Sequence, residues 1–159
     1  IRKKYCGLDG FEIWGEEKTL LNLKKEWPDP ISEETQEILR IESKTPLYGV
    51  DIISETIPQE ADLYSALDFN KGCYIGQETI ARLEHRGHVN KKLSLLKLSG
   101  NRLPDAGIRI LTKEGEDAGY VTSSCYSPKY NSVIALAYIR YSYFSSKEFR
   151  VENQAALSI

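Results

Sequence analysis

The stretch after Asn90 limits the fold of this chain most. It consists of short segments rich in β-branched and aromatic residues, and turn residues separate these segments at nearly regular intervals. Such a series of short strands is typical of a small antiparallel barrel. The sequence therefore predicts a C-terminal β-barrel domain over residues 91–159. The predicted strands are Leu93 to Leu98, Ile108 to Thr112, Ala118 to Ser124, Val133 to Arg140 and Phe149 to Glu152.

Residues 1–90 show a mixed α and β pattern, so the expected fold class is α+β. Residues 10–15 alternate between apolar and other side chains between two glycines, which predicts a short strand. Apolar residues at helical spacing predict a helix over residues 16–27 that Pro28 stops. Ser32 is a good N-cap for a second helix, which we expect to end before Pro46.

Residues 46–62 read as a turn-rich connector that leads to the loop Leu67 to Leu83. In this loop Gly72 and Gly76 bracket Cys73 just before a run with apolar residues at helical spacing. We therefore expect a helix over Gln77 to Arg86 and a left-handed C-terminal cap at Gly87.

Cys73 is the best candidate for chemistry, because Lys71 and the N-terminus of the following helix would both stabilise its thiolate. The alternative is a buried cysteine that acts as a small apolar side chain, and the residues alone leave both interpretations open. Cys6 and Cys125 have no comparable setting, so we expect them to be buried. Three widely spaced cysteines form neither a disulfide framework nor a metal site, which favours a reducing compartment.

Charge and hydropathy exclude two further classes of function. The net charge of −2 and the pI of about 5.8 argue against an extended basic surface for nucleic acid. The apolar runs are shorter than the roughly 20 residues of a membrane span, so we expect a soluble protein without a membrane partner. One basic cluster remains, and we read it as a solvated face, with an anionic ligand tail or an RNA phosphate as alternatives. The cluster consists of Arg82, His85, Arg86, Lys91 and Lys92.

Two further residue patterns allow more than one interpretation. Gly87 interrupts the helix face between His85 and His88, so we do not expect this H-x-x-H pair to bind zinc. Arg40 lies between Leu39 and Ile41. It either lays its stem over apolar neighbours, with its head in water or in an ion pair, or aims its guanidinium at a ligand carboxylate.

The octet Lys71-Gly72-Cys73-Tyr74-Ile75-Gly76-Gln77-Glu78 resembles the signature of the YgfZ-type folate-binding proteins, relatives of the glycine-cleavage T-protein. Residues 39–42, 46–51, 56–60, 119–123 and 135–140 support the resemblance, which spans nearly the whole chain. It implies ferredoxin-like α+β lobes around a folate site, followed by the barrel. Residues 1–90 would form the later part of these lobes. Because the chain begins with Ile1 and contains no Met, we expect an earlier part of the lobes to be missing.

The resemblance also assigns roles to single residues. It implies that Glu12 accepts hydrogen bonds from the pterin ring of tetrahydrofolate and that Arg40 holds the folate tail. Lys71 and Cys73 are implied as the catalytic residues. Tyr74 and Gln77, which belong to the same octet, are expected to contact the cofactor.

The function that the resemblance implies is a tetrahydrofolate-binding accessory protein for the assembly or repair of iron–sulfur proteins, with linked effects on tRNA modification. Its partners would be folate and iron–sulfur client proteins in the cytoplasm, or in an organelle matrix if the source is eukaryotic. Contact with nucleic acid would be weak or indirect. The alternatives are an aminomethyltransferase that acts on a lipoyl-bound intermediate and a non-catalytic folate-binding regulatory module.

Overall fold

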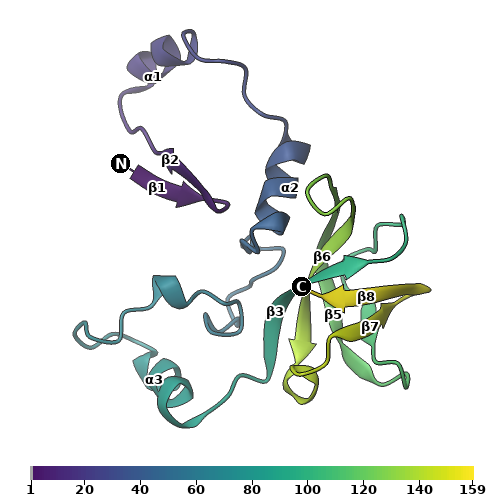
Figure 1. Cartoon of the computed structure of the whole chain (residues 1–159). Helices are drawn as coiled ribbons and strands as arrows, with labels where there is room; N and C mark the ends of the chain where they lie inside the picture. The colour runs from purple at the N-terminus through teal and green to yellow at the C-terminus, as the bar shows by residue number, and fades with distance from the viewer. Residues whose placement is uncertain (1) are drawn as a thin grey trace.

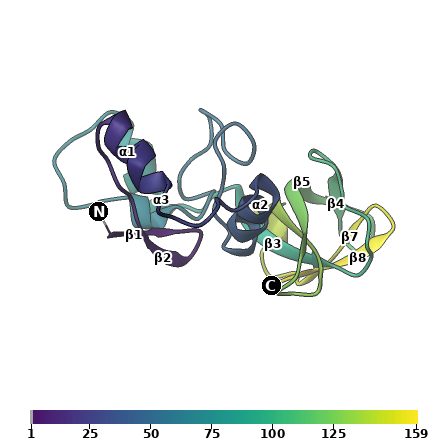
Figure 2. The ribbon, with the colours of Figure 1, turned by 90° about the horizontal axis from the view of Figure 1, so that it is seen from above.

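The computed structural model describes residues 2–159, except for the side chains of residues 2–5 and 84–86. A closed antiparallel barrel forms the C-terminal half of the chain, and a small sheet with three α-helices precedes it (Figure 1). The hairpin and first helix lie away from the barrel, whereas the second helix lies against it (Figure 2). The α+β fold class with a C-terminal barrel is therefore confirmed. Among the described residues, no helix is long and apolar enough to cross a membrane.

The chain begins with an antiparallel hairpin of β1 (Arg2–Tyr5) and β2 (Leu8–Phe11). Cys6 and Gly7 connect the strands with φ values of +49° and +76°. Two consecutive left-handed residues match the twist of paired strands, which explains this tight turn. Phe11 pairs with Arg2, and the described ladder ends there. The strand predicted over residues 10–15 is therefore wrong beyond Phe11.

Two helices follow the hairpin. Helix α1 (Glu17–Lys24) is shorter than the predicted segment, because turns replace the helix before Pro28. Helix α2 (Glu33–Glu42) begins as predicted, and the Ser32 hydroxyl accepts a hydrogen bond from the Thr35 N–H at 3.1 Å. Such a bond satisfies one of the backbone donors that a helix start leaves unpaired.

The connector and a 3-10 turn, η1 (Tyr64–Ala66), lead to α3 (Gln77–Arg86), whose bounds match the prediction. The left-handed cap predicted at Gly87 is wrong, because Gly87 has an extended backbone with φ −130° and ψ −178°. The left-handed glycine is Gly76, at the other end of the helix, with φ +88°. A Cβ at Gly87 would lie 3.2 Å from the side chain of Leu83, so close packing is the reason for that glycine.

The barrel has six strands in the order β3-β6-β5-β4-β7-β8, and β8 closes it by pairing with β3. The sequence predicted five of these strands and missed β8, which has no β-branched or aromatic residue to mark it. A short turn, η2 (Tyr141–Tyr143), follows β6. The strands are β3 (Lys91–Leu98), β4 (Arg109–Leu111), β5 (Asp117–Ser127), β6 (Ser132–Arg140), β7 (Glu148–Val151) and β8 (Gln154–Ser158).

Strand β6 is the centre of the core, because its residues 133–139 are all buried. Alternate residues of the strand point to opposite faces. Val133 and Ala135 belong to the cluster that fills the barrel, whereas Ile134 and Leu136 pack with Ile41 of α2. The barrel is thus filled inside and covered outside by α2.

Gly119 lets β5 and β6 approach closely. A Cβ at this position would lie 1.8 Å from the carbonyl oxygen of Tyr138, and φ is +154°. The obstacle is backbone rather than a flexible side chain, so a small rotation cannot relieve it. The strand pair therefore requires glycine here.

We expect Gly119→Ala to lower the free energy of unfolding by about 3 kcal/mol, because β5 and β6 must separate locally. Chemical denaturation of the purified protein measures this loss. Gly107→Ala is the matched control: Gly107 also has a positive φ, +85°, but no atom lies within 4 Å of the point that an added methyl group would occupy. The control should cost only about 1 kcal/mol, and equal losses would contradict the explanation by close approach.

Candidate functional site

The loop before α3 is shaped by hydrogen bonds from its own side chains. The Asp68 carboxylate accepts hydrogen bonds from the N–H groups of Asn70 and Lys71, at 2.8 and 3.2 Å. The Gln77 side-chain oxygen accepts one from the Tyr74 N–H at 3.2 Å. These bonds replace the regular backbone ladder that a loop lacks. They fix the backbone on both sides of Cys73.

Three of the predicted site residues meet in this loop. Lys71, Tyr74 and Gln77 line a hollow of about 470 Å³ together with Asp68, Phe69, Glu78 and Ala81. The Lys71 ammonium lies 4.5 Å from the centroid of the Tyr74 ring, a cation–π contact. The hollow thus combines an aromatic ring, an ammonium group and carboxylates, which suits a polar ligand with a flat part.

Cys73 is exposed to solvent and does not line this hollow. Its neighbour Ile75 is fully exposed as well, at 104%. Cys6 and Cys125 are buried, as the sequence predicted, and burial raises the pKa of Cys125 to about 11. Of the two interpretations of Cys73, the buried apolar one is therefore wrong. The chemical role of its thiol stays a prediction.

Arg40 lies at the centre of a buried polar network. Its Nη1 donates to the Asp51 carboxylate and to the Thr45 carbonyl oxygen, the second bond at 3.0 Å. Its Nη2 donates to Glu37 and, at 2.9 Å, to the Ser123 hydroxyl, and its Nε donates to Glu37 at 2.8 Å. A guanidinium has five N–H groups, and the chain provides an acceptor for each.

Electrostatics keep this arginine charged although it is only 5% exposed. Burial by itself would lower the pKa of Arg40, but the hydrogen bonds and charges of Glu37 and Asp51 outweigh burial and raise it. The structure therefore shows the ion pair that one interpretation of Arg40 foresaw. A folate carboxylate would have to replace one of the present partners, and Glu37 is the more exposed of the two carboxylates, at 40% against 0% for Asp51.

Asp51 is a site residue that the sequence reasoning did not single out. Its Oδ1 accepts hydrogen bonds from the hydroxyls of Thr122 and Ser123, both at 2.5 Å, and its Oδ2 accepts one from the Leu47 N–H at 2.9 Å. A buried arginine needs a carboxylate partner, so burial of Arg40 would have predicted that an acidic residue lies beside it. The sequence does not tell which of the many acidic residues supplies it.

Glu12 directly follows β2 and is half-buried. It lies between Phe11 and Ile13, which line an apolar hollow of about 370 Å³ against α1. Neither Glu12 nor Arg40 lines the hollow of the loop. The predicted residues thus fall into three places: the end of β2, the Arg40 network, and the loop before α3.

Two members of the predicted basic cluster have partners of their own. Lys91 donates to the Tyr120 hydroxyl at 2.9 Å, and Lys92 forms an ion pair with Asp62 at 3.1 Å. Arg82 is exposed, whereas the side chains of His85 and Arg86 lie outside the described residues. Within the part of the chain that the structure describes, no group of three or more His, Cys, Asp or Glu could hold a metal ion.

Comparison with known proteins shows what the barrel is similar to. Residues 91–157 match the family model for the glycine cleavage T-protein C-terminal barrel domain. A solved structure, the glycine cleavage system aminomethyltransferase T from Bartonella henselae, superposes on 78% of this chain and 36% of that one with a TM-score of 0.66 at 24% identity. This likeness extends the shared fold beyond the barrel into the preceding residues.

The similarity in sequence also reaches beyond the barrel. The chain is 35% identical over 143 residues to an aminomethyltransferase of Aquifex aeolicus, covering 87% of this chain and 39% of the relative. It is 34% identical over 161 residues to one of Thermotoga maritima, covering 96% and 42%. The chain is thus distantly homologous to aminomethyltransferases over most of its length and spans about two fifths of theirs.

We predict that Cys73 alone reacts rapidly with iodoacetamide at about pH 8, because the other two thiols are buried and remain protonated. Peptide mass spectrometry after short labelling of the native protein measures the modified fraction of each cysteine. Labelling in denaturant is the control, in which all three thiols should react. Rapid native labelling of Cys125 would contradict the structure.

Proposed function

We propose that this chain takes part in tetrahydrofolate binding and aminomethyl transfer, in a protein of the aminomethyltransferase type. The observation that carries the proposal is the homology to aminomethyltransferases over 87 to 96% of the chain. The names of these relatives favour this alternative over the iron–sulfur accessory function. The substrate would be the lipoyl-bound intermediate that the alternative implies.

The residues at the end of β2 fit a pterin ring. Glu12 offers a carboxylate that can accept two parallel N–H bonds from the amino-oxo edge of such a ring. Phe11 and Ile13 on either side line the apolar hollow, which can receive the flat face of a heterocycle. Tetrahydrofolate, when bound, would supply the acceptor for a one-carbon unit.

Arg40 fits the folate tail only after an exchange of partners. Glu37 now occupies the edge of the guanidinium formed by Nε and Nη2, with two hydrogen bonds. This is the geometry in which a ligand carboxylate would bind an arginine. We therefore propose that Glu37 competes with the folate carboxylate, while Asp51 continues to hold Nη1.

A calorimetric titration of the full-length gene product with tetrahydrofolate tests this assignment. We expect Glu12→Gln to weaken binding about tenfold, because one charged acceptor is lost. Glu37→Gln should strengthen binding a few-fold by removing the competitor. Glu34→Gln, an exposed carboxylate of the same helix, is the control and should change nothing. Unchanged affinity in Glu12→Gln, or weaker binding in Glu37→Gln, would contradict the assignment, and absent formation of methylene-tetrahydrofolate with glycine-cleavage partners would contradict the activity.

The second candidate function is the folate-binding accessory protein of the YgfZ type that supports iron–sulfur proteins and, through them, tRNA modification. The observation in its favour is the exposed thiol of Cys73 in the octet loop, two residues along the chain from Lys71, whose ammonium lies over the Tyr74 ring. A thiol in this position is accessible to a client protein or to a small reactant. Aminomethyl transfer by the T-protein type gives no comparable reason for it.

We expect Cys73→Ala to lose the ability to restore iron–sulfur enzyme activity in cells that lack the protein, if this second function holds. The measurement is the activity of a client enzyme at equal amounts of the expressed variant. Thr79→Ala, which changes an exposed residue of α3, is the matched control and should restore activity fully. Full restoration by Cys73→Ala would remove the thiol from the function.

A further inference from the structure

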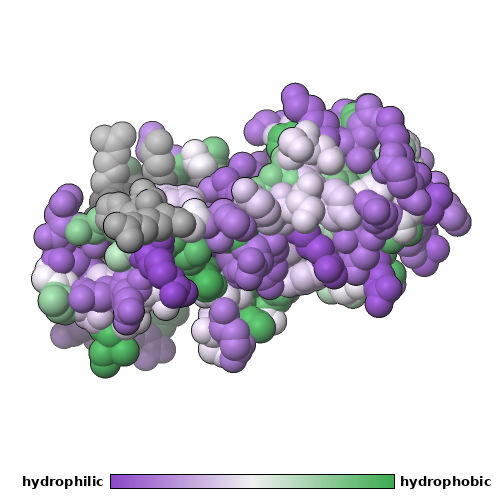
Figure 3. Space-filling model, turned by 90° about the horizontal axis from the view of Figure 1, so that it is seen from below, coloured by the Kyte–Doolittle hydropathy of each residue, from purple (hydrophilic) through white to green (hydrophobic). Residues whose placement is uncertain are grey.

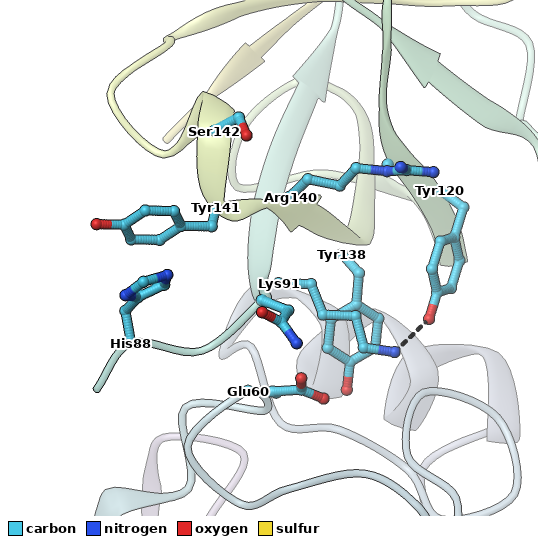
Figure 4. A pocket seen from close by; sticks show the side chains of 10 residues that line it. Glu60, His88, Lys91, Tyr120, Tyr138, Arg140, Tyr141 and Ser142 are labelled. Atoms are coloured by element: carbon cyan, nitrogen blue, oxygen red, sulfur yellow. Dashed lines mark hydrogen bonds between the residues drawn. The ribbon is translucent and has the colours of Figure 1, made fainter. Parts of the chain in front are cut away.

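A second hollow, of about 560 Å³, lies at one end of the barrel (Figure 4). Its side chains come from the connector, from the segment before β3, and from β3, β5, β6 and η2. None of the predicted site residues lines it. Its volume falls within the roughly 300–1,000 Å³ of small-molecule sites. The lining residues are Glu60, His88, Asn90, Lys91, Gly119, Tyr120, Tyr138, Arg140, Tyr141 and Ser142.

The hollow has a buried floor and an exposed rim. Glu60 and Tyr138 are 7% and 2% exposed, whereas His88, Arg140 and Tyr141 are exposed to solvent. This arrangement leaves a path from solvent to the polar groups of the floor. These polar groups distinguish the hollow from the apolar regions exposed on the N-terminal half, some of which appear green in Figure 3.

Two aromatic pairs form its walls. Tyr120 and Tyr138 lie 5.6 Å apart between ring centroids, and His88 stacks on Tyr141 at 3.7 Å with an angle of 21° between the ring planes. Figure 4 shows the two pairs on opposite sides of the cavity. Aromatic walls favour a ligand with a flat apolar part, which stacks or packs edge-on against them.

Lys91 places a cation in this cavity. Its Nζ donates to the Tyr120 hydroxyl at 2.9 Å and lies 4.5 Å from the centroid of the Tyr138 ring. An ammonium group has three donors, so two remain for other acceptors. Arg140 stands at the rim, where its Nη2 pairs with Asp117 at 2.8 Å.

Glu60 places an anion in the same cavity. The residue is more than nine-tenths buried and lines the cavity. Its carboxylate oxygens are not among the fully enclosed unpaired side-chain atoms of the described residues, so they remain open to the cavity. Figure 4 shows this carboxylate turned toward the cavity, near the end of the Tyr138 ring. A carboxylate that is largely removed from solvent is stabilised by a cationic partner. The site therefore offers an unused acceptor.

The Tyr138 hydroxyl is the second unpaired polar group of the floor. It is buried and makes no hydrogen bond of normal geometry with the described residues, although Thr56 lies close enough to influence it. Burial raises the pKa of Tyr138 to about 12, so the phenol is neutral at physiological pH. It adds a neutral donor or acceptor beside Glu60.

Glu60 and Lys91 carry opposite charges in one cavity but are not within ion-pair distance of each other. A single ligand with a cationic and an anionic group satisfies both. We propose that this hollow binds a free aromatic α-amino acid, whose ammonium group pairs with Glu60, whose carboxylate pairs with Lys91, and whose ring lies between the aromatic walls. The proposal is independent of tetrahydrofolate binding, because no residue is shared.

Calorimetric titration of the full-length gene product with L-tryptophan, L-tyrosine and L-phenylalanine tests the proposal. We expect at least one of them to bind. N-acetyl and amide derivatives of that amino acid lack the positive and the negative charge, respectively, and each should bind about tenfold or more weakly, the loss for one charged hydrogen bond. L-alanine, which has no ring, should bind more weakly still. These ligand changes test each contact without any risk to folding.

Two variants test the residues themselves. Glu60→Gln and Lys91→Met should each weaken binding about tenfold or more. Glu114→Gln, an exposed carboxylate, and Lys129→Met, whose ammonium lies 5.2 Å from the Tyr130 ring outside this hollow, are the matched controls and should leave the affinity unchanged. The proposal is overturned if no aromatic amino acid binds, if L-alanine or the N-acetyl derivative binds equally well, or if a control variant weakens binding as much as Glu60→Gln.

Discussion

The ion pair between Arg40 and Asp51 joins segments of this chain that lie far apart in the sequence. Arg40 comes from α2, Asp51 from the connector, and both bond to Ser123 of β5. Removing one partner from such a buried pair leaves a charge in a region that cannot hydrate it, which typically costs about 3–5 kcal/mol. The apolar contact of Ile41 with the outer face of β6 depends on the same placement of α2. This polar network and this apolar contact dock the residues before the barrel, together with the ion pair of Asp62 with Lys92 and the hydrogen bond of Glu42 with Ser127.

The same network connects the proposed folate site to the fold. Its inner half, Asp51 with Thr122 and Ser123, is fully buried and structural. Its outer half is Glu37 on the exposed side of Arg40, and the proposed folate carboxylate would take the place of this residue while the inner half keeps its bonds. The loop with Cys73 lies outside this network, and the hollow of Glu60 and Lys91 has its own walls. Three separate regions can thus be tested by independent substitutions.

Local signals in the sequence predicted much of this structure. The Ser32 cap, the bounds of α3 and most of the barrel strands follow from residue types within a few positions of one another. Strand β8 was not predicted, because Gln154 to Ser158 contains no β-branched or aromatic residue. It becomes a strand only by pairing with β3 and closing the barrel. Gly87 was misread because its reason is contact with Leu83, not backbone conformation. The partners of Arg40 lie up to 83 residues away, and single-sequence patterns carry no information about such contacts.

The register between β5 and β6 depends on Gly119. In most strands, apolar and polar residues alternate, so a shift by one residue would expose the apolar side chains and is disfavoured. Residues 133–139 are buried on both faces, so their hydropathy alone scarcely distinguishes the native pairing from a shifted one. A shift would bring Ala118 or Tyr120 into the place of Gly119 opposite Ile139, where a Cβ would collide with the Tyr138 carbonyl oxygen. The absence of a Cβ at Gly119 thus fixes the register of β5 against β6.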